Sequence, residues 1–116
     1  MSNGIYIHIP FCLAKCAYCD FNSYAGKLCM ADSYIDALIS EMKSFKGLSA
    51  DTVYIGGGTP TVLSEKQLEK LITFVNGNFV LSRDTEFTVE SNPATASTEK
   101  YRLLKKLGVN RLSIGV

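Results

Sequence analysis

The feature that most restricts the fold of this chain is the regular alternation of short apolar segments with longer amphipathic ones. Four short segments have the apolar content of strands, and they are residues 4–9, 52–55, 86–90 and 111–116. Three stretches with apolar residues at helical spacing separate them. Alternating strands and helices form βαβ units, in which the strands run parallel and the helices cover the sheet. The sequence therefore predicts an α/β fold, with a parallel sheet and outer helices.

The three helical stretches carry signals at their ends. The first spans about residues 31–46 and stops before Gly47, and the third spans about residues 98–107 and stops before Gly108. The second begins with a capping box formed by Ser64 and Gln67, and Asn76-Gly77 is predicted to close it. We expect the following side chains to face the core: Ile35, Leu38, Ile39, Met42, Phe45, Leu68, Leu71, Ile72, Val75, Tyr101, Leu104 and Leu107.

The length of the chain limits how much of such a fold it can complete. With 116 residues and 47% apolar content, it is expected to form one compact unit. A complete (β/α)8 barrel needs roughly 250 residues. We therefore expect residues 1–116 to be the N-terminal portion of a partial (β/α) barrel, whose sheet stops in its fourth strand.

Charge and targeting signals exclude several classes of partner. The 12 Lys and Arg residues nearly balance the 11 Asp and Glu residues, which leaves a net charge of +1 and no attraction to nucleic acid or anionic lipid. No window approaches the roughly 20 apolar residues of a membrane span, and Met1 to Pro10 does not read as a leader. We expect a cytoplasmic protein that starts at Met1, in which cysteines bind metal or catalyse rather than form disulfides.

Three of the four cysteines form a compact motif. Cys12, Cys16 and Cys19 have the spacing C-x3-C-x2-C, which predicts three ligands at one centre. A [4Fe-4S] cluster is normally held by four thiolates, so three would leave one iron open to a ligand with an amine and a carboxylate. The alternatives are a set of buried thiols or a structural zinc site, which almost always has four ligands. Cys29, ten residues beyond Cys19, and His8 are the remaining candidates for a fourth.

Five motifs together resemble a known family. They run in family order over most of the chain: Tyr-Ile-His-Ile-Pro-Phe-Cys at 6–12, Cys-Ala-Tyr-Cys-Asp-Phe at 16–21, Gly-Gly-Gly-Thr-Pro at 56–60, Glu-Ser-Asn-Pro at 90–93 and Asn-Arg-Leu-Ser-Ile-Gly-Val at 110–116. The chain is similar to the radical S-adenosylmethionine (SAM) superfamily, and within it to the oxygen-independent coproporphyrinogen-III oxidase-like group, which includes related haem chaperones.

The resemblance implies that Cys12, Cys16 and Cys19 hold a [4Fe-4S] cluster. It also implies that Tyr18 packs beside the cluster against the SAM adenine and that Tyr6 lies close to the same site. Cys29 matches no ligand of the family. His8 is left out of the predicted site, because a strand histidine is more often a satisfied core residue than a catalyst.

The glycine loop after the second strand and the acid at the end of the third are the other candidates. Residues 56–60 follow a strand at the edge where α/β barrels place active sites. Taken alone, the loop could be a tight turn or a phosphate cradle, and Glu90 could be a solvated charge. The resemblance implies that Gly57, Gly58 and Thr59 line the amino and carboxylate end of SAM through backbone carbonyls, and that Glu90 also contacts SAM.

The implied chemistry has two versions. In the first, the reduced cluster donates an electron to SAM and a 5′-deoxyadenosyl radical serves porphyrin-related chemistry, as in coproporphyrinogen III oxidation. In the alternative, the protein is a haem chaperone that binds haem and passes it to a partner. Oxidases proper tend to carry a further cysteine where this chain has Phe21, which favours the chaperone-like branch. The implied partners are porphyrinogen or haem and an electron donor such as flavodoxin or ferredoxin.

Overall fold

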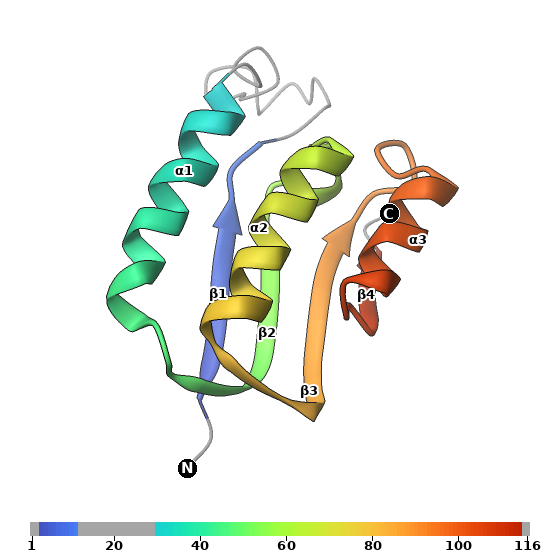
Figure 1. Cartoon of the computed structure of the whole chain (residues 1–116). Helices are drawn as coiled ribbons and strands as arrows, with labels where there is room; N and C mark the ends of the chain where they lie inside the picture. Colours follow the sequence, from blue (N-terminus) through green and yellow to red (C-terminus); the bar gives the residue numbers. More distant parts are fainter. Residues whose placement is uncertain (1–2, 12–29, 115–116) are drawn as a thin grey trace.

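The computed structural model describes residues 3–11 and 30–114, and within them the predicted alternation of strands and helices is confirmed (Figure 1). The elements follow one another in this order: β1 (Gly4–Ile9), α1 (Ala31–Met42), the 3-10 turn η3 (Lys43–Phe45), β2 (Ser49–Gly57), the 3-10 turn η4 (Pro60–Val62), α2 (Glu65–Asn78), β3 (Val80–Ser91), α3 (Thr98–Lys106) and β4 (Arg111–Ile114).

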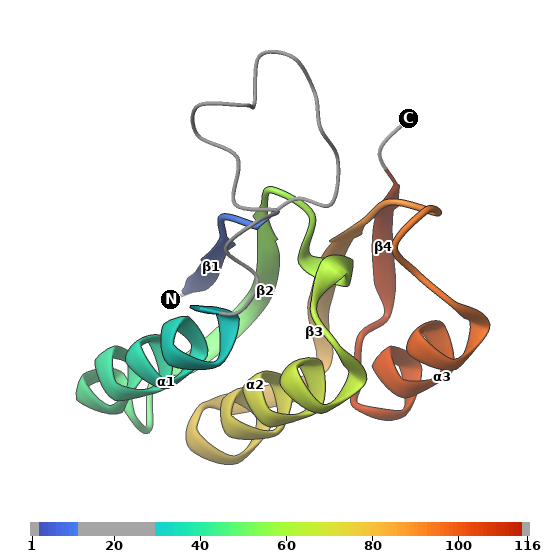
Figure 2. The ribbon, with the colours of Figure 1, turned by 90° about the horizontal axis from the view of Figure 1, so that it is seen from above.

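The four strands form one sheet in the order β1-β2-β3-β4, and every neighbouring pair is parallel. Figure 2 shows α1, α2 and α3 together on one face of this sheet. A doubly wound sheet carries helices on both faces, whereas sequential parallel strands with a single outer layer of helices are typical of a (β/α) barrel. The predicted fold class is therefore confirmed. The face opposite the helices is called the inner face below.

The core lies between the sheet and its helices. In β1, Ile7 and Ile9 point to the helices and are buried, while Tyr6 and His8 on the inner face are exposed. This alternation follows from the two-residue period of a strand. The helix-facing positions of β2 and β3, and one face of α2, complete the core with Val53, Ile55, Phe87, Val89, Leu68, Leu71, Ile72 and Val75. Burial of each such side chain contributes about 1.5–3 kcal/mol.

Helix α2 begins as predicted but ends later. The Ser64 side chain accepts from the Gln67 N–H at 3.1 Å, and the Gln67 side chain accepts from the Ser64 N–H at 2.9 Å, which confirms the capping box. The predicted end at Asn76-Gly77 is wrong, because the helix continues to Asn78. Gly77 is not among the glycines with positive φ, so it forms part of the helix instead of stopping it.

Two further predictions need correction. Phe45 was expected to face the core, but α1 ends at Met42 and the following 3-10 turn rotates Phe45 outward, where it is 53% exposed. The third strand was expected over residues 86–90. Instead, β3 starts at Val80, because Val80 and Leu81 pair with the beginning of β2 before an irregularity in the register. The turns predicted at Gly47 and Gly108 are confirmed, with φ angles of +92° and +104°.

Strand β4 forms one edge of the sheet. Among the described strands it pairs only with β3. Its apolar residues Leu112 and Ile114 are 37% and 57% exposed; Val116 lies outside the described residues. Within the part of the chain that the structure describes, every helix is too short or too polar to span a membrane.

Candidate functional site

The carboxyl ends of β1, β2 and β3 meet at one edge of the sheet, and the predicted glycine loop lies there (Figure 1). Strand β2 ends at Gly57, whose φ is +113°. A Cβ atom at this position would lie 2.7 Å from the His8 ring and 2.8 Å from the Ile9 carbonyl oxygen. This position therefore requires a residue that tolerates positive φ and has no Cβ atom. Glycine meets both requirements, because it adopts positive φ without strain and leaves room for the neighbouring strand.

The loop is joined by hydrogen bonds to the chain segment that follows β1. Gly58 donates its backbone N–H to the Ile9 carbonyl at 2.7 Å, and Thr59 donates to the Phe11 carbonyl at 2.7 Å. Phe11 directly precedes the first predicted cluster ligand, Cys12. The glycine loop is therefore fixed against the point from which the cysteine segment departs.

Glu90 is partly buried near the end of β3, and both of its carboxylate oxygens accept hydrogen bonds from β2. The Tyr54 hydroxyl donates to Oε2 at 2.6 Å, and the Gly57 N–H donates to Oε1 at 2.9 Å. The hydrogen bond to Glu90 raises the pKa of Tyr54 above its ordinary value. A carboxylate offers about four acceptor positions, so Glu90 retains capacity for donors from a ligand.

The backbone N–H groups of residues 57–59 are all used in these contacts. A phosphate or anion cradle needs backbone N–H groups that point at the ligand, and this loop does not offer these three. Any backbone contact between the loop and a ligand must then come from carbonyl oxygens, which accept hydrogen bonds from a cation such as an ammonium. Of the alternatives left open by the sequence, the phosphate cradle is thus disfavoured.

Beside Glu90, the inner face carries aromatic side chains. The rings of Tyr6 and Tyr54 are stacked with centroids 5.8 Å apart and an interplanar angle of 17°. The Tyr6 hydroxyl lies 3.3 Å from His8 Nδ1. Thr88, two residues before Glu90 in β3, has a buried hydroxyl with no hydrogen-bond partner among the described residues. Such groups normally have a partner in the protein or in ordered water. The exposed Tyr6 ring, in contrast, gives this face an aromatic surface that a ligand can reach.

A recess of about 220 Å³ opens at the carboxyl ends of β2, β3 and β4. Its lining residues come from the three segments that follow or end these strands, and they are Gly58, Thr59, Glu90, Ser91, Asn92 and Ser113. The recess is smaller than the roughly 300–1,000 Å³ of a typical small-molecule pocket. It is thus sized for one end of a ligand rather than for the whole of it.

The structure brings together part of the predicted SAM site. Gly58, Thr59 and Glu90 line one recess, although they are distant in the sequence. Gly57 does not line it, but its N–H holds the Glu90 carboxylate in place. Tyr6 lies on β1 at the opposite edge of the sheet from β4 and does not line the recess.

The predicted cluster ligands Cys12, Cys16 and Cys19, together with Tyr18, lie outside the described residues. Within residues 3–11 and 30–114, no group of three His, Cys, Asp or Glu residues is arranged to hold a metal ion.

The two ends of the cysteine segment are nevertheless fixed at the same edge of the sheet. Phe11 follows β1, and its ring meets the Tyr34 ring of α1 edge-on with centroids 5.4 Å apart. The Tyr34 hydroxyl donates to the His8 carbonyl at 2.6 Å, and burial raises the pKa of Tyr34. The start of α1 is therefore fastened to the end of β1, beside the glycine loop.

Sequence reasoning missed Tyr54, Asn92 and Ser113. Tyr54 could have been found from strand alternation, because it lies two residues before Gly56 on the face that also carries Glu90. Ser113 could not, because its place opposite Glu90 depends on the pairing of β3 with β4.

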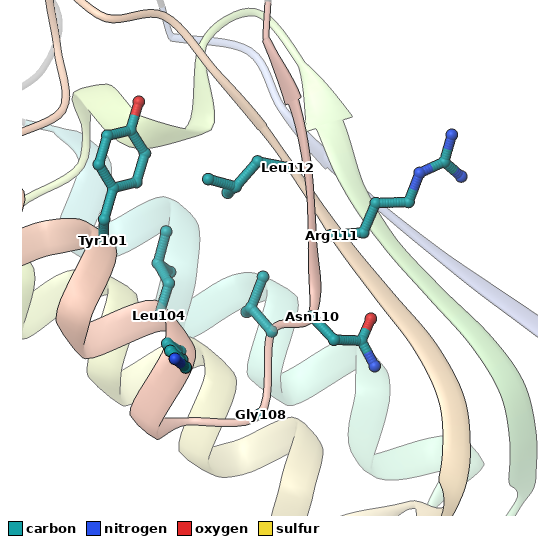
Figure 3. Close-up of a pocket in the computed structure, with 8 residues that line it drawn as sticks. Tyr101, Leu104, Gly108, Asn110, Arg111 and Leu112 are labelled. Atoms are coloured by element: carbon teal, nitrogen blue, oxygen red, sulfur yellow. The ribbon is translucent and has the colours of Figure 1, made fainter.

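A hollow larger than this recess lies elsewhere. It measures about 620 Å³ and lies between α3 and β4. Figure 3 shows Leu112 extending toward Tyr101 and Leu104 on the helix, while the Arg111 side chain points away from them. Arg111 pairs with Glu86 at 2.9 Å, and both side chains are exposed. This hollow shares no residue with the recess at Glu90, so we do not assign it to the same site.

Comparison with known proteins identifies the family of this chain. Residues 6–116 match the radical SAM superfamily. The chain is 49% identical over 116 residues to the heme chaperone HemW of Bacillus subtilis and 40% identical over 118 residues to the heme chaperone HemW of Escherichia coli. These alignments cover 96% and 97% of this chain but only 31% of each relative. The chain thus spans less than a third of the length of these curated relatives.

A solved structure also resembles the chain. It is that of the coproporphyrinogen III oxidase HemN from Escherichia coli, described as a radical SAM enzyme. It matches with a TM-score of 0.80 and 33% sequence identity, over 97% of this chain and 27% of that one. The parallel sheet with outer helices therefore corresponds to part of that fold.

Proposed function

Because the chain belongs to the radical SAM superfamily, we propose that it binds a [4Fe-4S] cluster through Cys12, Cys16 and Cys19 and holds SAM at the carboxyl edge of its sheet. The observation that carries this proposal is the convergence of Gly58 and Glu90 on one recess, next to the point where the cysteine segment leaves β1. We also propose that residues 1–116 form the N-terminal portion of the radical SAM domain, since the chain spans 31% of its relatives.

The described residues suit the amino-acid end of SAM. The loop N–H groups of residues 57–59 are already donated, so its backbone is suited to accept from an ammonium rather than to bind an anion. The Glu90 carboxylate adds a negative charge with free acceptor capacity. Both features favour a cationic, hydrogen-bonding ligand.

Each residue of the proposed site then has a defined task. Glu90 and the carbonyls of Gly58 and Thr59 bind and orient SAM, while Gly57 and Tyr54 hold the Glu90 carboxylate. Tyr6 presents an exposed aromatic ring beside Tyr54, and Tyr18 is proposed to pack near the adenine. When bound, the reduced cluster supplies the electron that cleaves the sulfur–carbon bond of SAM.

For the whole protein, we propose two alternative functions, and both involve a porphyrin-type ligand. One is oxidation of a porphyrinogen through a 5′-deoxyadenosyl radical, as the name of the HemN neighbour suggests. The other is binding of haem and its transfer to a partner, which is favoured by the names of the HemW relatives and by Phe21. Both would use an electron donor such as flavodoxin or ferredoxin, and both suit a cytoplasmic location.

An experiment in two stages tests these proposals. Anaerobic reconstitution of a full-length form should give about four iron and four sulfide per chain, and calorimetry should then detect SAM binding that depends on the cluster. Iron uptake without SAM binding would contradict the SAM site. For the whole protein, haem retention without porphyrinogen turnover favours the chaperone, whereas turnover with release of 5′-deoxyadenosine favours the oxidase.

A further inference from the structure

We propose that Lys100 is a positioning residue that joins the two loops on either side of the SAM recess. One is the loop after β2, which contributes Gly58 and Thr59 to the lining, and the other is the turn after β3, which contributes Asn92. This inference rests on the proposed function, because it assigns Lys100 a role in shaping the same site. Lys100 itself lies in α3 and does not line the recess.

The first observation is the pair of contacts made by the Lys100 ammonium. Nζ donates to the Thr61 carbonyl at 2.7 Å and to the Thr95 carbonyl at 2.9 Å. Thr61 lies two residues after Thr59, and Thr95 lies three residues after Asn92. A single side chain therefore bonds to both loops at once, close to their recess-lining residues.

The second observation is a cluster of hydroxyl groups between the same loops. Thr61 is fully buried in the 3-10 turn η4. Its hydroxyl lies 2.7 Å from the Thr95 hydroxyl and 3.4 Å from that of Ser91, and it accepts from the Asn92 N–H at 3.3 Å. Ser91 in turn shares a hydrogen bond of 2.9 Å with Tyr101 of α3. The loops are thus connected through polar contacts rather than through apolar packing alone.

The Lys100 ammonium is partly buried, and no carboxylate among the described residues forms an ion pair with it. The two ion pairs among the described residues involve other side chains, so no described carboxylate lies within 4.0 Å of its ammonium. Burial lowers the pKa of Lys100, although the negative charge of Glu65 opposes this. A partly buried cation without a close counter-ion is costly unless hydrogen bonds satisfy it. The two loop carbonyls provide these bonds, so the ammonium and the loops hold one another in place.

The structural consequence concerns Glu90 and the glycine loop. The recess lies where the loop after β2 faces the turn after β3, and Glu90 lies near the end of β3, just before that turn. Loss of the Lys100 contacts removes two bonds that link these segments. We expect them to separate or fluctuate more, which would displace Thr59 and Asn92 from their positions around a ligand.

The test uses the cluster-loaded protein and the substitution Lys100→Met, with Lys106→Met as control. Lys106 lies in the same helix and is exposed, so its substitution removes the same charge without touching either loop. We expect Lys100→Met to keep its iron but to bind SAM about tenfold or more weakly in calorimetry. Lys106→Met should bind like the wild type.

Two further readouts separate positioning from general stability. The electron paramagnetic resonance signal of the reduced cluster should change less on SAM addition in Lys100→Met than in the wild type. Without SAM, amide hydrogen exchange should rise in residues 57–61 and 91–95 of this variant. If Lys100→Met does not fold, the variant Thr95→Val replaces it in the test. This variant removes the Thr95 hydroxyl, which contacts the Thr61 hydroxyl in the other loop and donates to the Asn92 carbonyl in its own turn, and it should weaken SAM binding in the same direction.

The outcomes distinguish this inference from the proposed function. If the wild type takes up iron but does not bind SAM, the proposed function fails and this inference fails with it. If the wild type binds SAM and Lys100→Met binds it equally well, the inference alone is overturned. Where Lys100→Met does not fold, equal binding by Thr95→Val overturns it in the same way. Weaker binding by Lys106→Met to the same extent would also overturn it, since the effect would then come from charge rather than from loop contacts.

Discussion

Tyr54 and Glu90 are joined by a hydrogen bond of 2.6 Å between the phenol and one carboxylate oxygen, and Gly56 makes this contact possible. A Cβ atom at Gly56 would lie 2.7 Å from the Tyr54 ring and 2.9 Å from the Glu90 carboxyl carbon. The Gly57 N–H holds the other oxygen of the same carboxylate. Tyr54, Gly56 and Gly57, all near the end of β2, thus set the orientation of the predicted SAM-binding acid.

Substitution of the acid should reduce SAM affinity. Glu90→Gln removes the negative charge but preserves one acceptor oxygen, so SAM binding should weaken by about tenfold or more while iron content stays unchanged. Tyr54→Phe retains the charge and should have a smaller effect. Calorimetry on the reconstituted variants measures both, and equal SAM affinity in Glu90→Gln and the wild type would exclude Glu90 from the site.

The same hydrogen bond predicts a dependence of stability on pH. Because the bond to Glu90 raises the pKa of Tyr54, folding favours the protonated phenol. This contribution is fully present below the ordinary pKa of 10.0 and is lost as the pH rises through the higher pKa of the folded state. Thermal unfolding at increasing pH should show a shallower alkaline loss of stability in Tyr54→Phe than in the wild type. Identical profiles would contradict the bond.

Gly57 and Gly77 provide a matched pair of glycine substitutions. Gly57→Ala places a Cβ atom against β1 at positive φ and should lower the free energy of unfolding by about 1–3 kcal/mol or more. SAM binding should weaken as well, because the Gly57 N–H positions Glu90. Gly77→Ala lies within α2 with nothing near its Cβ position, and it should raise stability by about 0.5–1 kcal/mol. Chemical denaturation distinguishes the two, and a neutral Gly57→Ala would refute the strained-turn assignment.

The cysteine assignment also stays a prediction. Cys12→Ala, Cys16→Ala and Cys19→Ala should each abolish uptake of about four iron and four sulfide per chain, while Cys29→Ala should retain it. Iron and sulfide analysis after anaerobic reconstitution of a full-length form measures this. Loss of the cluster in Cys29→Ala would replace the three-ligand site with a four-ligand one.

The edge strand predicts self-association of the 116-residue polypeptide. The apolar residues Leu112 and Ile114 of β4 are 37% and 57% exposed beside a strand edge that has no partner among the described strands, which favours pairing with another chain. The isolated polypeptide should elute as an oligomer in size-exclusion chromatography and should not turn over SAM. Ile114→Lys should shift it toward monomer, because a charge at a strand edge opposes association. A monomer that cleaves SAM would show that this unit is self-sufficient.

The sequence alone determined the order and class of the elements. Strand and helix periodicities depend on residues close in the chain, which is why the alternation, the capping box at Ser64 and the turns at Gly47 and Gly108 could be predicted. The motifs around Cys12 and Glu90 also indicated the radical SAM superfamily. Element ends were less certain, as Gly77 and Phe45 illustrate, because tertiary packing decides whether a helix continues or turns.

Only the tertiary structure decided which residues meet. The parallel register places Ser113 opposite Glu90 and leaves room at Gly56 for Tyr54 to reach the carboxylate. Likewise, no local pattern links Lys100 to Thr61, which is 39 residues away. Such contacts depend on how strands pair and helices pack across the whole sheet, and the hydrophobic periodicity that defines each element carries no information about them.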